Sequence, residues 1–149
     1  MKILAPLKGE VIPIAEVSDP VFGEEILGKG VAIRPTGNRV VSPIKGIVTQ
    51  MFDTGHAVSL TSDDGVEVLI HVGLDTVRLK GEHYTPRVKE GDNVNPGDVL
   101  IEFNREGIAA GYDTTTPIVI CNSDDFKDFD MIVEKTVSEG DEIMLLRRK

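Results

Sequence analysis

Two histidines, His56 and His71, are the residues of this chain whose type and spacing offer chemistry. His71 ends the strand-like run GVEVLIH, and His56 opens the run HAVSL within FDTGHAVSL. Imidazole has a reference pKa of about 6.5, so it is largely neutral near pH 7 and can act as a nucleophile, a hydrogen-bond donor or a metal ligand. A close pair of imidazoles could therefore relay a phosphoryl group or supply two ligands to a zinc ion.

The segments beside the two histidines predict a β-hairpin that brings them together. Residues 57–61 and 66–70 are mainly aliphatic or β-branched, and the turn-forming sequence Ser-Asp-Asp-Gly lies between them. Strand alternation puts every second residue of Val66–Val72 on one aliphatic face, which we assign to the core, and places His71 on the other face. Both imidazoles then lie at the open end of the hairpin.

Phosphoryl transfer by a histidine requires groups that orient the ring and stabilise the phosphoryl oxygens, and the residues around His71 could supply them. A nucleophilic His71 needs a backbone carbonyl that fixes its tautomer through the second ring nitrogen, and Gly73 is where the chain could turn back to supply one. His56 would face the phosphoryl group as a hydrogen-bond donor. Thr54 lies two residues before His56, on the same face, and could orient its ring.

Length and composition fit one domain covering residues 1–149. Hydrophobic residues make up 40% and charged residues 28% of the chain, as in ordinary globular proteins. No apolar run approaches the roughly 18 residues of a membrane span, and strand-like residues begin at Ile3, which leaves no room for a secretory signal. The single cysteine, Cys121, cannot form an internal disulfide, so we expect a cytoplasmic protein that does not insert into a membrane.

The charge balance argues against one large class of partners. The formal net charge is −9 and the pI is near 4.8. Nucleic-acid binding requires clustered Lys and Arg side chains, so we expect no nucleic-acid partner and favour a basic protein partner instead. The same acidity would also keep a small protein soluble without any partner.

The rest of the sequence predicts an all-β fold, a sandwich or barrel with one or two short helices. Short β-branched runs alternate with turn signals along most of the chain. Ile118–Cys121 is expected as a buried strand. The expected helical segments are a turn over Glu24–Leu27 ended by Gly28, a helix over 105–110 capped by Asn104, and a helix over 125–130 capped by Ser123 or Asp124.

Three segments give the chain a family resemblance. They are VEVLIHVGLDTV around His71, FDTGHAVSL around His56, and GVAIRPTGNRVVSPIKGIV before both. These segments resemble the glucose-type IIA protein of the bacterial phosphoenolpyruvate-dependent sugar phosphotransferase system, and the likeness extends from Leu4 to Asn122. The resemblance implies an antiparallel β-sandwich of the barrel-sandwich, duplicated hybrid type. It also implies a phosphotransferase component that works through a phosphohistidine and requires no cofactor.

The resemblance further implies roles for individual residues. His71 matches the phosphorylated histidine, His56 the supporting histidine, and Thr54 the threonine bonded to it. Asp75 matches the aspartate of the Gly-Leu-Asp-Thr motif. The histidine phosphocarrier protein would donate the phosphoryl group, and the IIB domain of a sugar permease would accept it. The apolar rim that docks both partners matches Val21, Phe22, Phe52, Leu69 and Val77.

Other functions are compatible with parts of the sequence. The turn SPIKGIV at 42–48 is similar to turns of zinc endopeptidases and of biotinyl and lipoyl carriers. A zinc hydrolase needs three protein ligands, usually including a His-x-His pair that this chain does not contain, and neither Lys45 nor Lys80 lies in a carrier signature.

Two further roles could accompany phosphoryl transfer. A weak zinc site at His56 and His71 could be completed by a partner's carboxylate. Docking could also regulate permeases or metabolic enzymes. The third histidine, His83, lies in the polar turn KGEHY and matches no functional position of the family.

Overall fold

Short β-branched runs separated by glycine and proline fold into fourteen strands and two short helices. The computed structural model describes all residues from Met1 to Lys149. The strands are β1 (Lys2–Leu4), β2 (Gly9–Pro13), β3 (Lys29–Pro35), β4 (Arg39–Val41), β5 (Gly46–Met51), β6 (Ala57–Ser62), β7 (Glu67–His71), β8 (Tyr84–Pro86), β9 (Asn93–Val94), β10 (Val99–Phe103), β11 (Thr116–Ile120), β12 (Phe126–Met131), β13 (Lys135–Val137) and β14 (Glu142–Arg148). The helices are α1 (Pro20–Gly23) and α2 (Arg105–Ala109), and the single 3-10 turns are η1 (Ile14–Glu16), η2 (Thr76–Leu79) and η3 (Ser123–Asp125).

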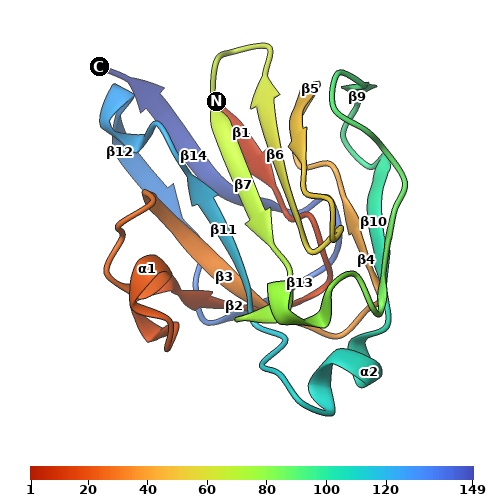
Figure 1. Cartoon of the computed structure of the whole chain (residues 1–149). Coiled ribbons are helices and arrows are strands. Elements are labelled where there is room, and N and C mark those ends of the chain that lie inside the picture. Colours follow the sequence, from red (N-terminus) through yellow and green to blue (C-terminus); the bar gives the residue numbers. More distant parts are fainter.

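All strand pairs are antiparallel, and they form three sheets. The large sheet has the order β13-β2-β3-β11-β7-β6-β5-β9, and the smaller sheets have the orders β4-β10-β8 and β1-β14-β12. In Figure 1, β12 and β14 lie at one side of the large sheet, and β4 and β10 lie at the other. The predicted all-β antiparallel sandwich is confirmed.

The main core lies between the sheets and includes the predicted aliphatic face of β7. It contains 28 buried residues, among them Val68 and Ile70 of that strand. The opposite face of β7 carries Leu69, which joins a second buried cluster together with Phe22 of α1. Both faces of β7 are therefore covered over its three central residues, and its last residue, His71, is partly exposed.

The first helix lies one turn earlier than the sequence predicted. We expected a helical turn over Glu24–Leu27, but the helix is α1, and the residues after it form turns. The Asp19 carboxylate accepts a hydrogen bond from the Val21 N–H at 3.0 Å, and Pro20 occupies the first helical position, where its missing N–H is not needed. The Asp-Pro start signal decided the position of this helix.

The second helix is confirmed where the sequence placed it. The Asn104 side chain caps α2 by accepting a hydrogen bond from the Gly107 N–H at 3.1 Å. None of the helices has the length and apolar content that a membrane crossing requires.

The helix predicted over 125–130 is wrong, because that segment is mostly strand β12. Phe126 is 3% exposed and packs into the core, and β12 pairs with β14 across a bulge between Lys127 and Asp130. Packing of Phe126 beside β14 outweighs the capping signal before it. Cys121 also differs from its prediction, since it follows β11 and its side chain is exposed.

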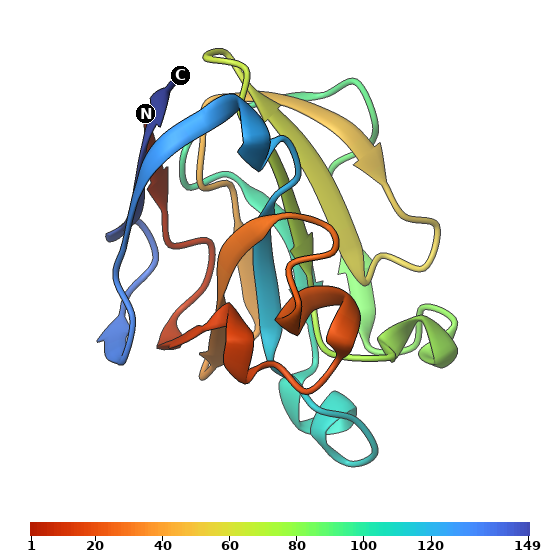
Figure 2. The same cartoon turned by 90° about the vertical axis from the view of Figure 1, so that its left-hand side faces the viewer.

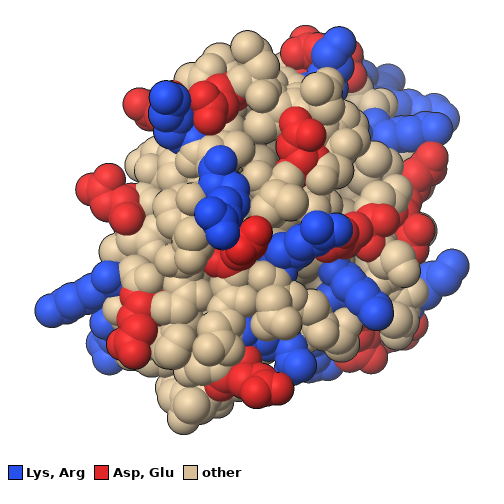
Figure 3. All heavy atoms as spheres, turned by 90° about the vertical axis from the view of Figure 1, so that its right-hand side faces the viewer, with Lys and Arg blue, Asp and Glu red and all other residues tan.

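Charged side chains of both signs cover the outside of the sandwich. Figure 3 shows Lys and Arg interspersed with Asp and Glu on the face where β9 and β10 lie, without a large area of one sign. Several of these groups are paired, as in the ion pair of Arg34 with Glu10 at 3.0 Å. Such exposed pairs contribute little to stability, so the buried sheets hold the fold together.

Gly30 of β3 marks a place where two strands leave no room for a side chain. A β-carbon there would collide with the carbonyl oxygen of Ile118 on β11. We expect Gly30→Ala to lower the free energy of unfolding by about 1–3 kcal/mol, measured by urea denaturation. Gly111→Ala is the control, because no atom lies within 4 Å of the added carbon. Equal effects of the two substitutions would contradict this account of β3.

Candidate functional site

The pairing of β6 with β7 places His56 and His71 against each other. Ala57 lies opposite His71 in the ladder, and the Val72 N–H donates to the His56 carbonyl at 2.7 Å. The two rings meet edge to face, with their centroids 4.8 Å apart at an angle of 79°. The hairpin predicted from the sequence is confirmed, and it brings the two imidazoles into contact.

The His71 ring is held by the backbone that follows it. Its Nδ1 lies 2.7 Å from the carbonyl oxygen of Gly73, and a carbonyl can only accept, so Nδ1 carries the proton. In the neutral ring Nε2 therefore keeps a free lone pair. Gly73 has φ 87°, and a β-carbon there would lie 2.5 Å from the Thr76 side chain. The turn that supplies the carbonyl thus requires glycine.

The peptide between His71 and Gly73 is anchored from two further sides. The Val72 carbonyl accepts hydrogen bonds from the Thr76 hydroxyl at 2.7 Å and from the Tyr84 hydroxyl at 2.8 Å. Burial raises the pKa of Tyr84 to about 12, so this hydroxyl keeps its proton over the whole physiological range. These bonds fix the backbone that orients His71, and the sequence alone did not single out Tyr84 or Thr76.

His56 is buried and oriented by its neighbours. Only 4% of it is exposed. The Thr54 hydroxyl is hydrogen-bonded to Nδ1 of the ring, and the Phe52 ring contacts it edge-on with centroids 5.5 Å apart. When the hydroxyl donates this bond, the single proton of the neutral ring lies on Nε2. Nε2 of His56 is then a donor, whereas Nε2 of His71 is a lone pair.

Burial keeps both rings uncharged. Burial, and to a smaller extent the neighbouring His71, lowers the pKa of His56 to about 4. Burial also lowers the pKa of His71, while the Gly73 carbonyl and the carboxylates of Asp19 and Asp75 act in the opposite direction. Both imidazoles are therefore neutral at pH 7, as a nitrogen nucleophile and its close neighbour must be.

Two carboxylates flank His71, and sequence reasoning identified only one of them. Asp75 was expected, and it precedes η2 with a left-handed backbone, φ 60°. Asp19 was missed as a site residue. It begins α1, and the sequence signal that could have located it is the Asp-Pro pair that caps this helix. Together they surround a neutral nucleophile with negative charge.

The apolar residues expected around the site occupy different depths. Phe22 lies 5.2 Å from the His71 ring between centroids, and both Phe22 and Leu69 are buried beneath the surface. Val21 is 40% exposed and Val77 is 54% exposed, while Phe52 is partly buried. Figure 2 shows α1 in front of the large sheet and the helical turn of η2 to its right.

Two further large apolar residues, outside the predicted rim, are exposed. Ile26 is 66% exposed and Leu27 is 39% exposed. Both follow α1, in the segment that the sequence placed in a helical turn. Because α1 ends at Gly23, both residues lie in the bend that leads to β3.

The chain contains no cluster of three or more His, Cys, Asp and Glu side chains that could hold a metal ion. His56 and His71 supply at most two ligands, and their ε nitrogens differ in protonation. A zinc ion here would need a further ligand from outside the chain and the loss of the proton on His56 Nε2.

The fold is shared with a known protein. The solved structure of glucose permease IIA from Mycoplasma capricolum aligns with a TM-score of 0.90 and 35% identity, covering 97% of this chain and 94% of that chain. The fold is thus that of a glucose-permease IIA component. Residues 1–126 match the family described as phosphoenolpyruvate-dependent sugar phosphotransferase system, EIIA 1, and the chain belongs to this family.

Curated relatives fall into two groups that differ in length. The chain is 41% identical over 144 residues to the glucose-specific EIIA component of Oceanobacillus iheyensis, covering 96% of this chain and 87% of that relative. It is 52% identical over 125 residues to the beta-glucoside-specific EIIBCA component of Bacillus subtilis, covering 83% of this chain. The chain spans 20% of the length of that relative.

The lowered pKa of His56 predicts a pH-dependent stability. The pKa of this ring is 6.5 in the unfolded chain and about 4 in the folded chain, so between these pH values the unfolded state binds more protons. This difference leaves the free energy of unfolding unchanged above pH 6.5. As the pH falls from 6.5 to about 4, the difference lowers the free energy of unfolding by roughly 3 kcal/mol. We expect the free energy of unfolding, measured by urea denaturation, to fall less between pH 7 and 4 in His56→Gln than in the wild-type chain. The same fall in both proteins would contradict the shift.

Proposed function

We propose that this chain is a phosphocarrier that accepts a phosphoryl group on Nε2 of His71 and passes it on during sugar uptake. The observation that carries the proposal is the hydrogen bond from His71 Nδ1–H to the Gly73 carbonyl, 2.7 Å long. It leaves Nε2 as the only nucleophilic nitrogen of a neutral ring. The His56 ring lies close enough to donate to the group once it is attached.

The transfer step needs no proton to leave His71. The lone pair of Nε2 attacks the phosphorus of a phosphohistidine on the donor, and the new P–N bond forms as the donor's P–N bond breaks. The proton on Nδ1 stays hydrogen-bonded to Gly73, so positive charge that develops on the ring is stabilised by that carbonyl. In the second transfer a nucleophile of the acceptor attacks the same phosphorus, and His71 leaves as a neutral imidazole.

His56 stabilises the phosphoryl oxygens in both directions. Its Nε2–H can donate to an oxygen while the Thr54 hydroxyl holds Nδ1. Because His56 is buried and neutral, it supplies a hydrogen bond without a competing positive charge. Thr54 acts through His56 and is a positioning residue.

The partners that fit this role are a phosphoryl donor and a permease domain. We infer that the histidine phosphocarrier protein donates and that the IIB domain of a sugar permease accepts, in the cytoplasm. The EIIBCA relatives support the pairing with a permease. The exposed Val21 and Val77 offer apolar contacts, and Asp19 and Asp75 favour a cationic side chain on the donor.

The same surface could also regulate other proteins. A phosphoryl group adds about −1.5 to −2 charges where the resting site carries a neutral ring. Docking of a permease or metabolic enzyme through this surface would therefore depend on phosphorylation. A zinc ion held by His56, His71 and a partner's carboxylate would occupy the nucleophilic lone pair, so zinc binding would compete with phosphorylation. A zinc hydrolase finds no third ligand here.

The phosphorylation site can be tested directly. With the general phosphotransferase components and labelled phosphoenolpyruvate, we expect stoichiometric acid-labile label on the wild-type chain and none on His71→Ala. His83→Ala is the matched control and should be labelled normally. Peptide mapping would locate the label, and label that persists on His71→Ala would eliminate the assignment.

The docking role of the rim predicts a change in apparent affinity. Val77→Asp puts a charge into an apolar contact and should raise the KM for the phosphorylated donor about tenfold, equivalent to about 1.4 kcal/mol, with a smaller effect on kcat. Val133→Asp is the control, because Val133 is also an exposed valine, 38% exposed, but belongs to the segment between β12 and β13. Equal effects of the two substitutions would remove Val77 from the interface.

A further inference from the structure

A second site-like feature lies apart from the histidine pair. It is a cavity of about 910 Å³ where β8 and the end of β10 meet the turns around Lys8, Asn38 and Ser138. Only two of its twelve lining residues are hydrophobic, and neither His56 nor His71 is among them. Segments far apart in the sequence thus converge on one hollow, and most of the residues that line it carry polar side chains.

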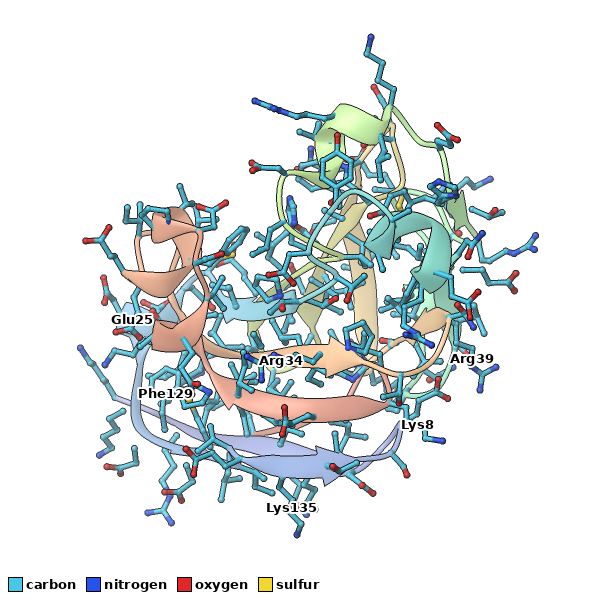
Figure 4. All side chains as sticks on the ribbon, turned by 90° about the horizontal axis from the view of Figure 1, so that it is seen from below. Lys8, Glu25, Arg34, Arg39, Phe129 and Lys135 are labelled. Atoms are coloured by element: carbon cyan, nitrogen blue, oxygen red, sulfur yellow. The ribbon has the colours of Figure 1, made fainter.

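The acidic side chains of this cavity are already paired within the protein. Glu139 accepts two hydrogen bonds from the Arg39 guanidinium, at 2.9 and 2.7 Å. Glu102 accepts one from Arg87 at 2.9 Å. Lys8 forms no ion pair, and Figure 4 shows it on the same side of the molecule as Arg39. The unpaired charge at the cavity is therefore positive.

Two amide side chains add oriented donors. Asn38 Oδ1 accepts from the Arg105 N–H at 3.0 Å, and Asn104 Oδ1 accepts from the Gly107 N–H at 3.1 Å. These backbone bonds determine which terminal atom of each amide is oxygen. The NH₂ group of Asn38 forms no hydrogen bond within the protein, and neither does that of Asn104. The fixed backbone bonds hold both donors in place.

His83 is also held in position, and the nearest polar group to its Nε2 is the Glu82 carboxylate, 3.7 Å away. It has a left-handed backbone, φ 77°, which is uncommon outside glycine. Its ring lies over α2, where a β-carbon at Gly107 would come within 2.5 Å of it. The ring makes no hydrogen bond, and its side chain is 24% exposed. The hydroxyl groups of Thr85 and Ser138 are likewise without partners at the cavity wall.

We propose that this cavity binds a small hydroxylated anion, such as a sugar phosphate or a sugar acid. Three of the unpaired groups, the Lys8 ammonium and the two amide NH₂ groups, can only donate, so they select a ligand rich in acceptors. Lys8 and the amides would hold the phosphate or carboxylate oxygens. The hydroxyl groups of Thr85 and Ser138 and the His83 ring, which can donate or accept, fit the ligand's hydroxyl groups. This site is independent of the phosphoryl transfer proposed above.

The proposal can be tested by NMR titration of the ¹⁵N-labelled chain. The probes are glucose 6-phosphate, gluconate and uncharged glucose. We expect glucose 6-phosphate or gluconate to shift the side-chain NH₂ resonances of Asn38 and Asn104 in a saturable way, with glucose at least tenfold weaker. The two anions distinguish a phosphate from a carboxylate site. Absence of saturable shifts with both anions, or equal shifts with glucose, would overturn the proposal.

Variants separate this site from the histidine pair. Lys8→Gln should weaken binding of the anion about tenfold, and Ser138→Ala should weaken it by a smaller factor. Lys89→Gln is the matched control, because Lys89 is also exposed and unpaired but lies outside the cavity, and it should bind normally. His71→Ala should keep full affinity. Loss of binding in His71→Ala, or unchanged binding in Lys8→Gln, would assign the anion to another place.

Discussion

The antiparallel pairing of β6 with β7 determines how far apart the two imidazoles lie. His71 is opposite Ala57 in that ladder, so His56 stands one residue beyond the paired region, with its carbonyl bonded to the Val72 N–H. A shift of one residue would turn every side chain of β7 to the other face and bury His71 in place of Ile70. The core therefore enforces the register that the site requires, and β11 on the far edge of β7 reinforces it.

Burial and hydrogen bonding then give two chemically identical rings different tasks. A carbonyl at His71 Nδ1 and a hydroxyl at His56 Nδ1 leave the two ε nitrogens with opposite character, one a lone pair and one an N–H. Rings whose centroids are 4.8 Å apart can pack against each other because neither is charged at pH 7. Two imidazolium ions at this distance would repel each other strongly. The lowered pKa of His56 is thus a condition for the geometry as well as a consequence of it.

Local sequence signals predicted the hairpin and its histidines, because strand alternation and a four-residue turn leave few other arrangements. They also predicted α2, whose Asn104 cap acts within a few residues. Features that depend on distant contacts were not predictable. Phe126 belongs to a strand because β14 lies beside it, and Asp19 flanks His71 because α1 folds over β7's outer face. Likewise Tyr84 supports the site through one hydroxyl bond that only the folded chain reveals.

Both ends of the chain leave the sandwich at one edge. The Met1 ammonium donates to the Leu146 carbonyl at 2.8 Å, and the Arg148 guanidinium donates to the Asp64 carbonyl at the closed end of the β6–β7 hairpin. The histidines occupy the open end of that hairpin, away from the termini in Figure 1. A flexible linker attached at either terminus would therefore leave the histidine end of the hairpin uncovered. Such a linker would raise the effective concentration of the histidines around a second domain joined to the chain, because the encounter of the two would then be intramolecular.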